Sequence, residues 1–78
     1  MSKQFNGHKN WNHWNVSLWI NNDQGLYDMA RRAVRQARND KKRAAEMVLE
    51  ELESLGVTHT PDGAPYSVTT IRAAMVEM

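Results

Sequence analysis

The stretch 10–27 constrains the fold of this chain more than any other, because it holds all three tryptophans and most of the asparagines. Trp11, Trp14 and Leu18 follow the i, i+3, i+7 spacing of one helix face, and Val16 and Ile20 share an adjoining face. Part of the stretch also alternates as a strand would, but the chain offers no second strand to pair with it. We therefore predict a central helix over 11–21, with Trp14 and Leu18 in the core and the asparagines facing solvent or capping helices.

Apolar periodicity predicts further helices over 24–38 and 41–55, and a short terminal helix that follows Ser67. Asp23, Asp40 and Ser67 have side chains suited to N-caps, and Gly56 follows the last apolar residue of its helix. One continuous helix over 24–55 remains an alternative, because the helical spacing of the apolar residues continues from 24–38 into 41–55. We favour two helices, since antiparallel packing buries both apolar stripes.

These elements predict an all-α fold, a small bundle of three to four helices in which 11–21 packs against 24–38 and 41–55. Residues 1–9 are polar and are expected to form a flexible lead-in, and 10–78 form the single domain. The chain has 78 residues and no cysteine, so neither disulfides nor a cysteine-bound zinc can reinforce its core. Large side chains or a homodimer would have to supply that stability.

The net charge is only +1, which argues against a strongly acidic DNA mimic and provides no global attraction to nucleic acid. The N-terminus lacks the apolar segment of a signal peptide, and no apolar run is long enough to span a bilayer. These features predict a cytoplasmic protein with no membrane partner.

Two blocks of sequence resemble those of one family. WNVSLWINND (14–23) continues into Gly25-Leu26-Tyr27, and TPDGA (60–64) is followed by Tyr66 and then IRAAM (71–75). Together they resemble small uncharacterised proteins encoded by bacteriophages and other mobile elements. The resemblance implies a phage accessory role in a bacterial host cell but no particular activity. Small phage proteins of this size often bind host proteins, including CRISPR surveillance complexes.

The candidate partner-binding residues fall into a basic group and an aromatic group. Seven cations and one acid lie between residues 31 and 43. Such a cluster can meet an acidic protein surface or follow a phosphate backbone, or it can be a solvated helix face. Exposed tryptophans commonly anchor protein interfaces. The predicted contact residues are Arg31, Arg35, Arg38, Lys42, Trp11 and Trp19.

No motif indicates a metal, cofactor or catalytic site. His8 and His13 lack the i, i+4 spacing of a helical metal-binding pair, and His59 is distant in sequence. Ser17 has no glycine elbow around it. Taken together with the resemblance to phage proteins, these features favour a non-enzymatic phage protein that inhibits a host protein or defence complex by occlusion, in the manner of an anti-CRISPR. The alternative is a small nucleic-acid-binding regulator that uses the basic face of 31–43.

Overall fold

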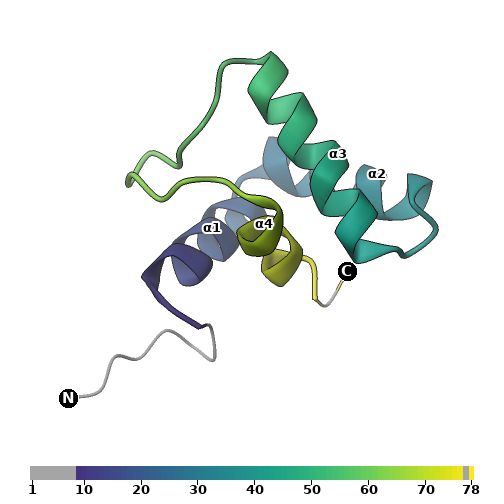
Figure 1. Ribbon diagram of the computed structural model, residues 1–78, viewed down its shortest axis with the longest axis horizontal. Coiled ribbons are helices and arrows are strands. Elements are labelled where there is room, and N and C mark those ends of the chain that lie inside the picture. Colours follow the sequence, from purple (N-terminus) through teal and green to yellow (C-terminus); the bar gives the residue numbers. More distant parts are fainter. Residues whose placement is uncertain (1–8, 77) are drawn as a thin grey trace.

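Over the residues that the structure describes, the protein is an all-α bundle of four helices, as the periodicity predicts (Figure 1). The computed structural model describes residues 9–76 and 78, so the predicted lead-in lies largely outside the described residues. The helices are α1 (Trp11–Asn22), α2 (Gln24–Gln36), α3 (Lys41–Ser54) and α4 (Val68–Ala74). A long loop between α3 and α4 carries the isolated antiparallel bridge between His59 and Pro65.

Local capping sets where the helices begin. The Asp23 carboxylate accepts from the Leu26 backbone N–H at 3.0 Å, and Asp40 accepts from that of Arg43 at 3.1 Å. Ser67 starts α4 through a reciprocal capping box with Thr70. All three predicted N-caps are confirmed. Each satisfies backbone donors that a helix start leaves without an intrahelical partner.

The segment 24–55 forms two helices rather than one. α2 ends at Gln36, two residues before the predicted end, because Arg38 and Asn39 have φ values of 55° and 69°. This left-handed backbone reverses the chain so that α3 packs against α2. Asparagine tolerates such a conformation, whereas arginine adopts it at some cost. Arg38 therefore lies in a turn and not on the helix face where the sequence placed it.

The packing order of the helices differs from the prediction in one respect. α1 packs against α2 and α4, and α3 packs against the same two helices. The expected direct packing of the 11–21 helix on the 41–55 helix is wrong, because α4 lies between them (Figure 1). The side chains of Ile71 and Met75 on α4 are fully buried there. The short terminal helix is thus part of the centre of the bundle.

The buried face of α1 is not the one predicted. Val16 and Ile20 are fully buried, whereas Leu18 is 39% exposed and Trp14 is half-buried. At 3.6 residues per turn the two pairs lie on roughly opposite sides of the helix, and not on the adjoining faces that we expected, so only one can face the core. The helices that contact α1 contribute Ala30 and Ala33 of α2 and Ala74 of α4 to the same core cluster as Val16 and Ile20. The core comprises Val16, Ile20, Ala30, Ala33, Val34, Ala44, Ala45, Val48, Leu52, Ala64, Tyr66, Ile71, Ala74 and Met75.

Candidate binding surfaces

The outer side of α2 presents an ordered pair of arginines, which we call the arginine face (Tyr27, Arg31 and Arg35). The three residues are spaced at i, i+4 and i+8, so they lie along one side of the helix. Arg31 Nη1 donates to the Tyr27 hydroxyl at 3.0 Å, and its guanidinium carbon lies 5.6 Å from the centre of the tyrosine ring. This contact restricts the Arg31 side chain before any partner arrives.

The charges of the arginine face have no carboxylate within ion-pair distance among the described residues. The ion pair found among the described residues joins Arg43 to Glu46, both on α3, at 3.4 Å. Arg31 and Arg35 are both exposed and border a shallow hollow of about 340 Å³ together with Tyr27 and Asp28. The two guanidinium groups can therefore pair with an external anion or carboxylate without breaking an internal ion pair.

The other predicted basic residues do not join this face. Lys42, in the first turn of α3, lines a separate hollow with Arg72 of α4. Arg32 borders the hollow beside the arginine face and also, with Arg43, Glu50 and Glu51, a third hollow between α2 and α3. The basic run of 31–43 is continuous in sequence but is divided among three surfaces in the fold.

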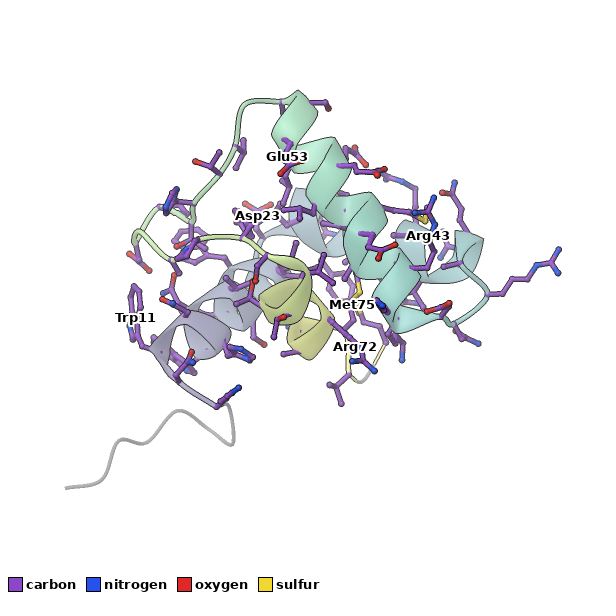
Figure 2. All side chains as sticks on the ribbon, viewed as in Figure 1. Trp11, Asp23, Arg43, Glu53, Arg72 and Met75 are labelled. Atoms are coloured by element: carbon purple, nitrogen blue, oxygen red, sulfur yellow. The ribbon has the colours of Figure 1, made fainter. Side chains whose placement is uncertain are left out.

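Trp11 lies on a different helix from the arginine face. It begins α1 and is 39% exposed, and Figure 2 shows it at the end of the molecule opposite Arg43. With Trp14 and Leu18 it forms the outer face of α1, an aromatic and apolar stripe that the core does not cover. A homodimer of the predicted kind would have this stripe available for its interface.

Trp19 has a structural bond of its own. Its indole Nε1 donates to Asp62 Oδ2 at 2.9 Å, which ties α1 to the loop between α3 and α4. The ring also borders an apolar groove of about 500 Å³. The lining residues from α2 and α3 include Leu26, Met29 and Leu52. Trp19 thus both stabilises the fold, through its bond to Asp62, and borders a surface groove. That groove contains neither Trp11 nor an arginine.

A buried polar network anchors the same loop, and sequence reasoning missed it. Asn15 is only 1% exposed, although the asparagines of this stretch were expected to face solvent or cap helices. Its side-chain oxygen accepts from the Thr60 hydroxyl at 2.6 Å, and its Nδ2 donates to Asp62 Oδ2 at 2.9 Å. The Thr60 hydroxyl also accepts from the Ala64 backbone N–H at 3.0 Å. The two blocks that carry the family resemblance are therefore hydrogen-bonded to each other.

The network and the burial around it shift two pKa values. The hydrogen bonds from Asn15 and Trp19 stabilise the charged form of Asp62 and lower the pKa of its carboxyl below the usual 3.8. Burial, together with the nearby negative charge of Asp23, raises the pKa of the Tyr66 hydroxyl above its usual 10.0. Both groups hold their pH 7 charge state more firmly than they would in water.

The described residues show no arrangement typical of a metal site. Across residues 9–76 and 78, no three histidine or acidic side chains come together in a way that could hold a metal ion. The His59 ring nitrogen Nδ1 lies 2.9 Å from the hydroxyl of its neighbour Thr58. The Ser17 hydroxyl lies 3.2 Å from the Asn21 amide nitrogen. The arrangement that the structure does provide is one of surfaces suited to binding.

Comparison with known proteins places the chain in a family. A family model matches residues 1–78. The chain belongs to the family of unknown function DUF7249. No curated protein and no solved structure matches it. Among the described helices, none combines the length and the apolar character needed to cross a membrane. Membership of this family indicates no activity, so the function of this DUF7249 member has to be inferred from its surfaces.

Proposed function

We propose that this protein is a phage-encoded accessory protein that binds an acidic site on a host protein through the arginine face and inhibits that protein by occlusion, without catalysis. The arrangement of Tyr27, Arg31 and Arg35 carries the proposal. The resemblance to phage and mobile-element proteins supports the host setting, in the cytoplasm of a bacterial cell. A host defence complex, as for an anti-CRISPR, is the target class that this setting favours.

The chemistry of the face favours a protein partner. Tyrosine and arginine are the residue types most often found at the energetic centres of protein interfaces, because they combine apolar area with directed hydrogen bonds. Holding Arg31 against Tyr27 reduces the side-chain entropy that binding would otherwise cost. The exposed cations would also steer the approach of an acidic surface.

The distribution of the basic residues disfavours the alternative, a nucleic-acid-binding regulator. A protein that follows a phosphate backbone presents its cations in one stripe or patch. Here Arg31 and Arg35 face one side, whereas Arg43 and Lys42 line two other hollows. Phosphate contacts would make log affinity fall steeply and linearly with log salt concentration, which protein contacts centred on Tyr27 would not.

The test is a pull-down from bacterial lysate, with and without nuclease, followed by titration of the partner that is captured. The Arg31→Glu, Arg35→Glu double variant should lose a stoichiometric, nuclease-resistant protein and weaken its binding by at least about a hundredfold. Lys9→Glu with Arg72→Glu makes the same change in net charge away from α2 and should retain the partner.

Two outcomes would overturn the proposal. If only nucleic acid is recovered, and nuclease removes it, the regulator is the correct reading of the basic residues. If the arginine-face variant and its charge-matched control bind every partner equally, the arginine face has no role in recognition.

A further inference from the structure

The packing of α1, α3 and α4 creates a hollow with a cationic lining that no sequence motif predicts. Lys41 and Lys42 come from the first turn of α3 and Arg72 from α4, which are separated by the whole of α3 and the following loop. Figure 2 shows Arg72 projecting from α4 on the side of the molecule where α3 begins. Tertiary structure therefore brings Arg72 to a pair of adjacent lysines that are distant from it in sequence.

The lining has a charged part and an apolar part. No carboxylate from the described residues lines the hollow, and none there lies within ion-pair distance of Lys41, Lys42 or Arg72. Asp40, next in sequence, is engaged in capping α3. Val68 and Ala73 of α4 form an apolar wall with Val76, which follows the helix, and His13 of α1 also borders the hollow.

The size and position of the hollow suit a small ligand. Its volume is about 550 Å³, within the range of small-molecule sites, which pair mostly apolar walls with a few directed polar groups. The start of α3 adds the positive end of its dipole beside the two lysines. Three like charges around one hollow repel one another, and a bound dianion would relieve that repulsion.

We propose that this hollow binds a small phosphomonoester with a compact apolar group. The phosphate would be held by Lys41, Lys42 and the bidentate guanidinium of Arg72, and the apolar group would lie on the wall formed by Val68, Ala73 and Val76. This site is distinct from the arginine face and does not depend on the function proposed for it.

Three probes at constant ionic strength separate the two parts of the site. They are phenyl phosphate, which has charge and ring, inorganic phosphate, which has charge alone, and phenol, which has the ring alone. Amide chemical shifts followed by NMR should move around the hollow with phenyl phosphate, at a dissociation constant in about the millimolar range. Inorganic phosphate should bind the same residues about tenfold more weakly, and phenol should not bind.

Matched variants assign the binding to these residues. Arg72→Gln and, separately, Lys42→Gln should weaken phenyl phosphate binding by about tenfold, because each removes a charge-assisted contact. Arg35→Gln removes the same charge from the arginine face and should change the dissociation constant less than twofold. Val76 is 71% exposed, so Val76→Ser should leave the fold intact. It should weaken phenyl phosphate but not inorganic phosphate.

The proposal fails if Arg35→Gln weakens binding as much as Arg72→Gln, since the effect would then be one of net charge. It also fails if phenyl phosphate binds no tighter than inorganic phosphate, or if no probe shifts the amides around the hollow. Circular dichroism of each variant checks that it folds. If Arg72→Gln does not fold, Lys42→Gln, which is at an exposed position, still tests the site.

Discussion

The loop between α3 and α4 and the arginine face of α2 are both polar, but their polar groups do opposite things. In the loop, Thr60 is 4% exposed and hydrogen-bonds to the equally buried Asn15, although the segment has no regular secondary structure. On α2, Arg31 and Arg35 lie on a regular helix, are exposed and have no ion-pair partner in the described part of the chain. Regular structure is therefore a poor guide to which polar side chains hold the fold.

The physical difference is whether water can solvate the group. A buried amide or hydroxyl that loses its partner keeps the full cost of desolvation, whereas an exposed guanidinium that loses one remains solvated. The loop network should therefore control stability and the arginine face should control binding. The three predictions below test that division on one scale, the free energy of unfolding.

Asn15→Ala should have the largest effect, a loss of about 3 kcal/mol, because it removes the partner of the Thr60 hydroxyl and one of the donors to Asp62. Chemical denaturation followed by tryptophan fluorescence measures it. The matched control is Asn22→Ala, which removes an exposed amide from the same helix and should cost less than about 0.5 kcal/mol.

Thr60→Val keeps the shape of its side chain and removes the hydroxyl, so it completes a double-mutant cycle with Asn15→Ala. The double variant should be less destabilised than the sum of the single variants by at least about 0.5 kcal/mol. Strict additivity, or equal losses for Asn15→Ala and Asn22→Ala, would show that the network does not hold the loop.

Asp62 should have a smaller effect, one that depends on pH. Its folded pKa is lowered by the hydrogen bonds from Asn15 and Trp19, so the unfolded chain binds the proton more readily. The stabilisation is present above the usual pKa of 3.8 and is lost as pH falls through the lower, folded value. Unfolding measured at pH 7 and at about pH 3 should show a smaller loss of stability for Asp62→Asn than for the wild type.

Asp28→Asn is the matched control for this pH dependence. It removes a carboxyl from the exposed side of α2, where its hydrogen-bond partner is the Gln24 amide at 3.0 Å. This variant should keep the wild-type loss of stability on acidification. If Asp62→Asn loses as much stability on acidification as the wild type does, the hydrogen bonds from Asn15 and Trp19 do not favour the charged carboxylate.

The arginine face should give the smallest change in stability. Arg31→Ala and Arg35→Ala should each alter the free energy of unfolding by less than about 0.5 kcal/mol, because both side chains are exposed, neither has an ion-pair partner among the described residues, and alanine favours the helix. Thermal and denaturant melts measure this. A decrease of more than about 1 kcal/mol in the free energy of unfolding of either variant would mean that the arginine face stabilises the fold.

The sequence by itself determined the local features of this protein. The N-caps at Asp23, Asp40 and Ser67 and the positive φ of 77° at Gly56 depend on neighbouring residues only, so their patterns predicted where the helices begin and where the third one ends. The all-α class followed from apolar periodicity. The exposure of Arg31 and Arg35 followed as well, because charged side chains at helical spacing opposite an apolar stripe face solvent.

Only the tertiary structure decided which face of α1 is buried and which cations meet. Leu18 and Ile20 are equally apolar candidates for the core, and the packing of α1 against α2 and α4 buries Ile20 and leaves Leu18 exposed. Asn15 is buried because a loop distant in sequence supplies Thr60 and Asp62 as its partners. Lys42 and Arg72 come together because α4 packs between α1 and α3. Each of these contacts joins residues far apart in the chain, and no local pattern encodes the energy that such a pairing gains.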